Sequence, residues 1–240
     1  MIRIFDTISE LNKGAAELFL QSALKAIKEK GQFTVALTGG SSPAGLYELL
    51  STPAYSRQID WSKTYVFWGD ERWVPLTDDR SNAKMAFNTL LSRVPIPGDN
   101  VFPMYHEHLS PGEYAAEYEK LLKKYLNGTG FDLILLGMGE DGHTASLFPD
   151  TQVLHEQSKW VVSYFLSAQD MYRITLTVPA INMAEKIAVI LFGAKKAESL
   201  HQVIEGERAP QKLPAQLLNP VKGELIWLTD KDAASKLTRE

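Results

Sequence analysis

Cysteine is absent from the 240 residues of the sequence. Its absence excludes disulfide bonds, thiolate nucleophiles and zinc sites built on cysteine. Long apolar runs are missing as well, since no stretch reaches the roughly 18 consecutive apolar residues of a membrane-spanning helix. Charged residues interrupt the first segment, MIRIFDTISELNKG, which therefore lacks the apolar centre of a signal peptide. We expect a cytoplasmic protein.

An excess of positive charge is also lacking. The net charge is −4 at pH 7, so neither nucleic acid nor an anionic membrane is expected as a partner. A small anionic ligand would need a local cluster of arginine and lysine. The chain is long enough to bury a core, and no linker or repeat divides it. We therefore predict a single domain over residues 1–240, with no obligatory protein partner.

Short apolar runs alternate with helical patterns along the chain. Buried strands are predicted over residues 33–38, 65–69, 131–137, 173–178, 187–193 and 224–229. Helices are predicted over residues 9–30, from Pro43 to Leu50, from the capping box at Ser110 to about Asn127, and over residues 194–204. This alternation predicts an α/β protein with three αβα layers around a Rossmann-like, mainly parallel sheet.

The residues that follow each strand are informative, because open α/β sheets bind ligands beyond the carboxyl ends of their strands. TGGSSP (residues 38–43) follows the first strand and precedes a helix. Its glycines can turn backbone N–H groups toward an anion, although a plain strand-to-helix turn would look the same. GDERW (residues 69–73) follows the second strand and is either a surface ion pair or part of a site.

The segment after the third strand, LLGMGEDGHTASLFP (residues 135–149), contains G-x-G-x-x-G. A dinucleotide site needs a full helix next, and Pro149 leaves little room for one, so nicotinamide binding is not expected. His143 stands in this glycine-rich turn, two residues after Asp141. A lone histidine is more often a structural residue, but the nearby acid and the turn favour a functional role here.

Two later segments add positive charge. Arg173 opens one predicted strand, and Lys196 follows another near the start of a helix, where Lys195 competes with it. Each of these side chains can also be an ordinary solvated charge. HEH (residues 106–108) has no evident third ligand, so no metal site is predicted. The sequence contains neither a G-x-S-x-G elbow nor a Walker motif, which disfavours a serine hydrolase of that kind and a P-loop nucleotide site.

Six segments together resemble the 6-phosphogluconolactonase family in residue type, order and spacing. They are TGGSSP (38–43), FWGDERWVP (67–75), SNAKMAFNTLL (81–91), LGMGEDGHTASLFP (136–149), RITLTVPAINMA (173–184) and FGAKKAESL (192–200). The resemblance covers essentially the whole chain. It implies the fold of the glucosamine-6-phosphate deaminase/6-phosphogluconolactonase type. It also implies hydrolysis of 6-phospho-D-glucono-1,5-lactone to 6-phosphogluconate in the oxidative pentose phosphate pathway, without a cofactor.

The resemblance also implies roles for single residues. His143 would be the general base that activates water, and Asp141 and Asp70 match acidic positions that the superfamily shares. A lactone is already an activated ester, so a positioned base suffices without a covalent nucleophile or metal. The remaining matched positions would bind the phosphorylated substrate, through side-chain charge or through backbone N–H groups: Arg72, Arg173, Lys196, Gly39, Gly40 and Ser41.

Two other functions stay open. Glucosamine-6-phosphate deaminases carry an acid five residues after the matching histidine, within a ring-opening proton relay. Phe148 occupies that position here and cannot transfer a proton, which disfavours the deaminase. A non-catalytic sugar-phosphate sensor is the second alternative, since related domains serve in that way, but no DNA-binding segment is evident.

Overall fold

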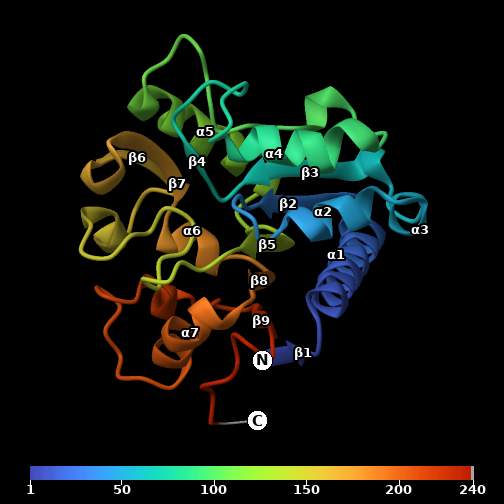
Figure 1. Ribbon diagram of the computed structural model, residues 1–240. Helices are drawn as coiled ribbons and strands as arrows, with labels where there is room; N and C mark the ends of the chain where they lie inside the picture. Colours follow the sequence, from blue (N-terminus) through green and yellow to red (C-terminus); the bar gives the residue numbers. More distant parts are fainter. Residues whose placement is uncertain (239–240) are drawn as a thin grey trace.

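A computed structural model of the protein describes residues 1–238 and contains two β-sheets (Figure 1). The larger sheet is parallel, with six strands in the order β1-β9-β8-β5-β2-β3. Its strands are β1 (Ile2–Phe5), β2 (Phe33–Leu37), β3 (Thr64–Trp68), β5 (Leu133–Leu136), β8 (Lys186–Leu191) and β9 (Glu224–Asp230). The smaller sheet is antiparallel, in the order β4-β7-β6, with β4 (Asp70–Arg72), β6 (Val161–Leu166) and β7 (Met171–Leu176).

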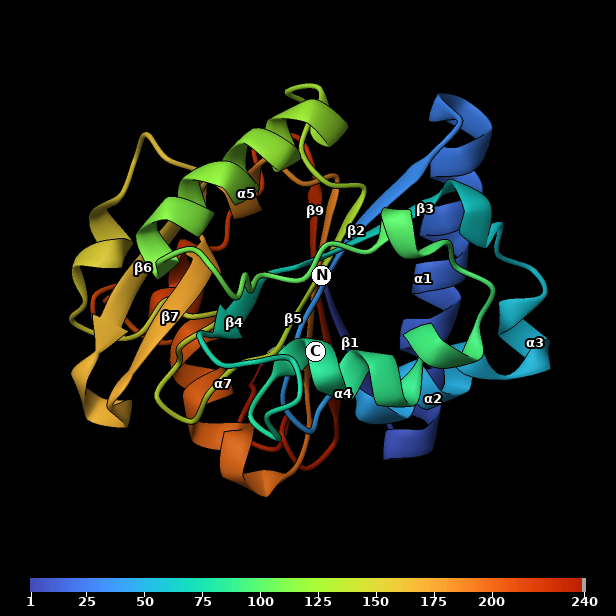
Figure 2. The ribbon, with the colours of Figure 1, turned by 90° about the horizontal axis from the view of Figure 1, so that it is seen from above.

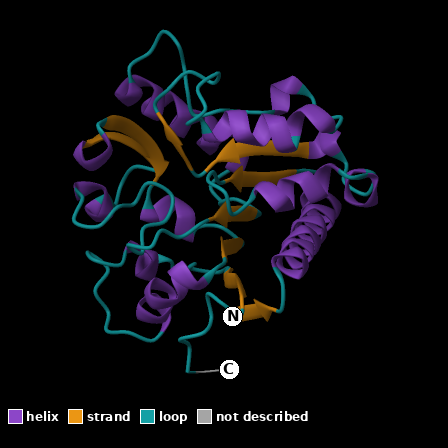
Figure 3. Cartoon of the chain, in the orientation of Figure 1, coloured by secondary structure: helices purple, strands orange, loops and turns teal. Residues whose placement is uncertain are grey.

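Helices cover both faces of the parallel sheet (Figure 2). On one face lie α1 (Ile8–Lys30), α2 (Ala44–Ser51) and α3 (Pro53–Ser56), and α4 (Asn82–Thr89) packs against α2. On the opposite face lie α5 (Pro111–Leu126) and α7 (Ala197–Ile204), together with the small sheet, and α6 (Val178–Asn182) follows β7. Figure 3 separates the helices from the strands in the orientation of Figure 1. The predicted three-layer αβα fold around a mainly parallel sheet is confirmed.

Short 3-10 helices connect several of these elements. They span Trp61–Lys63, Leu91–Arg93, Gly98–Asn100, Gln152–His155, Ser167–Gln169, Ala194–Lys196 and Pro214–Leu217.

The core lies on both sides of the parallel sheet. Every residue of β2 and β5 is buried, which matches their continuous apolar sequences, because strands covered on both faces need no polar side. Helix α1 places buried side chains at helical spacing toward the sheet, among them Leu11, Ala15 and Phe19. The helix ends at Gly31, whose φ of 76° is a left-handed conformation that glycine adopts without steric cost.

All six predicted strands form, but one belongs to a different sheet. The segment predicted over residues 173–178 is β7, which pairs with β4 and β6 in the antiparallel sheet and ends at Leu176. Val178 opens α6 instead of extending the strand. Residues 194–196 form a 3-10 turn before α7, so the last predicted helix is regular only from Ala197. The sequence does not predict β1, β4 and β6; β1 and β4 are short and partly polar.

A buried carboxylate fastens α4 to β4. Glu71 is fully buried and accepts hydrogen bonds from the backbone N–H groups of Arg72, Asn82 and Ala83, each at 2.8 Å, and from the Ser81 hydroxyl at 3.0 Å. Burial raises the pKa of Glu71 to about 7, although the backbone hydrogen bonds favour the charged form. The contact fixes the start of α4 beside the strand that carries Arg72.

Replacing Glu71 by Gln should lower the free energy of unfolding by about 1–3 kcal/mol, because the new amide NH₂ cannot accept from an N–H donor. The raised pKa lets the folded protein hold a proton between pH 4.5 and about 7 that the unfolded chain has lost. The carboxyl contribution is therefore full below pH 4.5 and declines as the pH rises to about 7. Urea denaturation should show a larger loss at pH 5 than at pH 8.

Glu117 on α5 supplies the control, since its side chain is 54% exposed and pairs with the exposed Lys120. Glu117→Gln should change the free energy of unfolding by less than about 1 kcal/mol. Equal stability of the parent and Glu71→Gln at both pH values would contradict the role given to Glu71.

Candidate active site

A cavity of about 260 Å³ lies beyond the carboxyl ends of the central strands. Its lining comes from the loops after β2 and β5, the strands β4 and β7, the turn between β6 and β7, and the starts of α4 and α7. β2 and β5 are neighbours in the sheet, yet the chain continues from β2 to β3 on one side and from β5 to β8 on the other. Such a switch point is where open α/β sheets bind ligands.

The structure brings the residues predicted from the sequence together around this cavity. Eight of them line it: Gly39, Gly40, Ser41, Asp70, Arg72, His143, Arg173 and Lys196. Asp141 lies beside them, hydrogen-bonded to His143. Of the two competing lysines, Lys196 contributes to the lining that the described residues form, and Lys195 does not.

His143 and Asp141 form a hydrogen-bonded pair at the mouth of the cavity. The imidazole Nδ1 lies 2.5 Å from Asp141 Oδ1, and the same oxygen accepts from the His143 backbone N–H at 3.2 Å. Partial burial raises the pKa of Asp141, but the hydrogen bonds from His143 outweigh this and hold it below its ordinary value. A carboxylate at Nδ1 keeps the proton there and leaves Nε2 unprotonated in the neutral ring. The pair therefore has the arrangement of a base with its orienting acid.

Glycine makes room for this pair. A Cβ atom on Gly139 would lie 2.1 Å from His143 Nδ1 and 2.4 Å from Asp141 Oδ1, closer than any side chain can approach. The turn closes through the Gly139 N–H, which donates to the His143 carbonyl at 2.8 Å, and Gly142 has a φ of 73°. No helix follows His143, as Pro149 indicated, and residues 140–149 form a sequence of turns. The glycines of this loop serve a tight turn and a close approach.

Gly139→Ala should displace the pair and lower kcat by about 10- to 100-fold while the protein stays folded, because small misplacement of a catalytic group is costly. Gly98→Ala is the control, since among the described residues a Cβ on Gly98 would meet no atom within 4 Å and Gly98 does not line the cavity. Steady-state kinetics with thermal unfolding of both variants checks this. A Gly139→Ala enzyme as active as Gly98→Ala would refute the close-contact argument.

Two arginines lie side by side on neighbouring strands of the small sheet. Arg72 of β4 and Arg173 of β7 are directly paired residues of antiparallel strands, and both line the cavity. Burial lowers the pKa of Arg173; Asp70 opposes this effect and the charge of Arg72 adds to it. Like charges in this position repel each other. Within residues 1–238, neither Nε atom has a hydrogen-bond partner, although both are buried. The pair is well placed to receive an anion.

Asp70 compensates part of this positive charge. It is buried, accepts from the Ser146 hydroxyl at 2.6 Å, and lies 4.0 Å from Arg173 Nη1. The Asp–Arg contact therefore joins Asp70 to Arg173 and is buried, whereas the sequence left open an exposed surface pair. Asp70 ties the loop that carries Ser146 to the small sheet.

Asn82 and Gln169 are among the lining residues that the sequence did not single out. Asn82, at the start of α4, donates to the Asp70 carbonyl at 2.9 Å and lies against Gly39, where a Cβ would come within 1.8 Å of Asn82 Oδ1. Gln169, in the turn between β6 and β7, accepts a hydrogen bond from Arg173 Nη2. Asn82 lies within a segment that carried the family resemblance, but nothing in the sequence pointed to Gln169.

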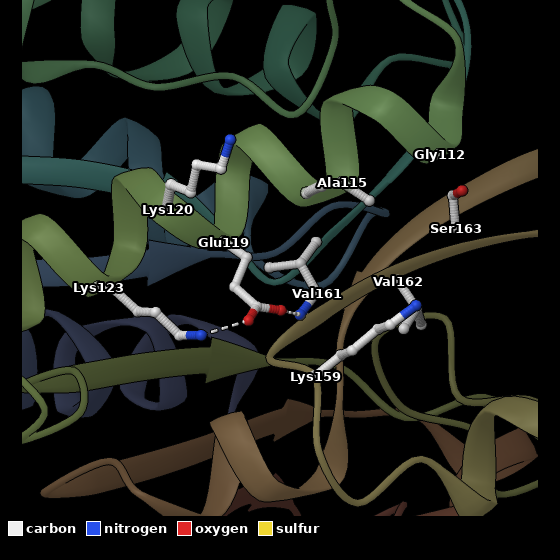
Figure 4. Close-up of a pocket in the computed structure, with 10 residues that line it drawn as sticks. Gly112, Ala115, Glu119, Lys120, Lys123, Lys159, Val161, Val162 and Ser163 are labelled. Carbon is white, nitrogen blue, oxygen red and sulfur yellow. Dashed lines mark hydrogen bonds and ion pairs between the residues drawn. The ribbon is translucent and has the colours of Figure 1, made fainter.

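A second hollow of about 430 Å³ lies between α5 and β6 (Figure 4). Figure 4 shows Lys123 pointing to Glu119, an ion pair of 2.6 Å, and Glu119 also accepts from the Val161 backbone N–H at 3.3 Å. These charges satisfy one another, and Lys120 lies on the exposed side of the helix. The hollow has none of the predicted site residues among the described residues that line it. The cavity at the strand ends is therefore the candidate site.

Groups of three or more histidine, aspartate or glutamate side chains that could hold a metal ion do not occur in the described part of the chain. At HEH (residues 106–108), the His108 backbone N–H donates to His106 Nδ1 at 3.2 Å. Across residues 1–238, no helix has the length and apolar character needed to cross a membrane.

Comparison with known proteins decides the family. The model of the glucosamine-6-phosphate isomerase/6-phosphogluconolactonase family matches residues 6–227. The chain belongs to this family. A 6-phosphogluconolactonase of Synechocystis sp. is 41% identical over 218 residues, covering 89% of this chain and 88% of its own. The chloroplastic 6-phosphogluconolactonase 3 of Arabidopsis thaliana is 40% identical over 248 residues, covering 98% and 75%.

Solved structures agree with this assignment. The 6-phosphogluconolactonase from Trypanosoma cruzi superposes with a TM-score of 0.85 at 28% identity, covering 99% of this chain and 97% of its own. A monomeric glucosamine-6-phosphate deaminase shares the fold, with a TM-score of 0.84 at 21% identity and coverage of 98% and 99%. The resemblance carried by the six sequence segments is confirmed.

Proposed function

We propose that the protein hydrolyses 6-phospho-D-glucono-1,5-lactone to 6-phosphogluconate, a step of the oxidative pentose phosphate pathway. Relatives named 6-phosphogluconolactonase match nearly the whole chain at about 40% identity, which supports a lactone-hydrolysing enzyme. One observation of the site carries the proposal. The His143–Asp141 pair shares its cavity with Arg72, Arg173 and Lys196. A base beside a cluster of cations suits a neutral ester that carries a phosphate.

The reaction needs one base and one water molecule. His143 Nε2 takes a proton from water while the water oxygen bonds to the lactone carbonyl carbon, and Asp141 stabilises the imidazolium that results. The tetrahedral intermediate then breaks its bond to the ring oxygen, and the imidazolium returns the proton to that oxygen. The products are a carboxylic acid and a free hydroxyl group, so no group is left on the enzyme.

The phosphate is bound by side-chain charge and by backbone N–H groups. Arg72 and Arg173 supply paired guanidinium groups, and Lys196 adds a third cation. Among the described residues, no side chain caps the start of α2, so its first N–H groups are open to an anion approaching from the turn Gly39–Ser41. This local positive charge lets an anionic substrate bind, although the net charge of the protein is −4.

A paired assay tests the function. Freshly made 6-phosphogluconolactone should be hydrolysed far faster with the protein than without it, followed as acid release. Glucosamine 6-phosphate should release no ammonia, since Phe148 stands where the deaminase relay needs an acid. Rates equal to the spontaneous rate would favour the sensor, and ammonia release would favour the deaminase.

Arg72→Ala and Lys196→Ala should each lower kcat/KM for the phosphorylated lactone by about 10- to 100-fold, since each variant loses a charged hydrogen bond to phosphate. Activity on unphosphorylated gluconolactone should change far less. Lys195→Ala is the control, because the neighbouring lysine does not contribute to the lining formed by the described residues. Equal losses on both substrates would remove these residues from phosphate recognition.

Several broader features remain proposals. We propose that residues 1–240 work as one domain, since both sheets contribute side chains to one cavity. Cytoplasmic location stays a prediction, and one similar relative is named as chloroplastic. Function without a cofactor, a metal, nucleic acid, a membrane or an obligatory protein partner also stays a prediction.

A further inference from the structure

Phe148 contacts both the base and one of the cations of the site. Its ring stacks on the His143 imidazole with the centroids 4.1 Å apart and the planes inclined by 20°. The guanidinium carbon of Arg173 lies 5.6 Å from the centroid of the same Phe148 ring. Phe148 is only 9% exposed and lines the cavity, so this ring is one wall of the site.

The hydrogen bond to Asp141 alone does not fix the plane of the imidazole. The imidazole turns about its Cβ–Cγ bond, and this single contact at Nδ1 opposes the turn only while the hydrogen bond stays formed. The Asp141 side chain is 48% exposed and the His143 side chain 29%, so water competes for this contact. A flat face stacked on the imidazole removes the remaining rotation, because offset-parallel aromatic rings have a preferred geometry.

Phe148 is itself held by the loop. Its carbonyl accepts from the Thr151 hydroxyl at 2.6 Å, and Pro149 follows it directly. Thr144 and Leu147 form a β-bridge just before it. Arg173 does not depend on the ring, because Gln169 and Asp70 also contact the guanidinium. Loss of the Phe148 ring should therefore disturb the base more than it disturbs the cation.

We propose that Phe148 is a positioning residue of the reaction: its ring sets the plane of the His143 imidazole so that Nε2 points into the cavity. The phenyl face neither donates nor accepts a proton, so Nε2 remains the single proton-transferring atom on that side. This inference rests on the proposed lactone hydrolysis.

Phe148→Leu and Phe148→Met remove the ring but keep apolar bulk, and Phe148→Tyr keeps the ring. The first two variants should lower kcat by about 10- to 100-fold with KM within about threefold of the parent. Phe148→Tyr should restore kcat to within about threefold. Phe102→Leu is the matched control, since it removes a ring stacked on Phe67 at 4.7 Å and 22°, and it should leave kcat unchanged. Full kcat in a folded ring-free variant would overturn the proposal, as would failure of Phe148→Tyr to restore kcat.

A spectroscopic measurement separates this inference from the proposed function. The imidazole C–H signals of His143, assigned by their loss in His143→Asn, should lie upfield in the parent and in Phe148→Tyr because of the stacked ring. They should move to ordinary positions in Phe148→Leu or Phe148→Met. Unmoved signals would overturn the stack whether or not the lactone is a substrate. An inactive parent with shifted signals would instead reject lactone hydrolysis. The stack of Phe148 on His143 would then be confirmed, but not its role in the reaction.

Discussion

The parallel pairing of β2 with β5 is the constraint on which the site depends. Neighbouring parallel strands end at the same edge of the sheet, so the loops after them must meet there. One loop brings a glycine turn and the start of α2, and the other brings His143 and Asp141. Residues about one hundred positions apart thus share a cavity without any direct bond between the two loops. The proposed base and the proposed anion-binding turn are thus placed by the backbone, and the side chains refine their positions.

The small antiparallel sheet adds the charge that the parallel sheet lacks. It places Arg72 opposite Arg173, an arrangement that is unfavourable by itself. Asp70 offsets part of the charge and Gln169 accepts a hydrogen bond from Arg173, and the phosphate that we propose would offset the rest. The buried Glu71 holds α4 beside β4, the strand that carries Arg72. This contact fixes the position of β4 despite the repulsion between the two arginines. An anion bound between these arginines, as we propose, would lower their mutual repulsion.

Sequence reasoning predicted residues that share one cavity, because its signals are local. Glycines, acids and His143 follow apolar strands directly, so their place at the sheet edge follows from the fold class. Side chains whose role depends on distant partners were not found. β4 is three charged residues long and forms only because β7 pairs with it, and Gln169 matters only through Arg173. The Phe148–His143 stack depends on a loop conformation in which Ala145 has a φ of 48°. No sequence pattern predicts this conformation.

The central claim is that His143 is the general base, and kcat of folded His143→Asn tests it most directly. Asparagine keeps a polar side chain of similar size but cannot take a proton from water. Loss of a positioned base costs about 10²- to 10⁴-fold in rate, so kcat should fall by that factor while KM changes little. A kcat within a few-fold of the parent, measured on folded protein, would contradict the account and move the search for the base to Asp70.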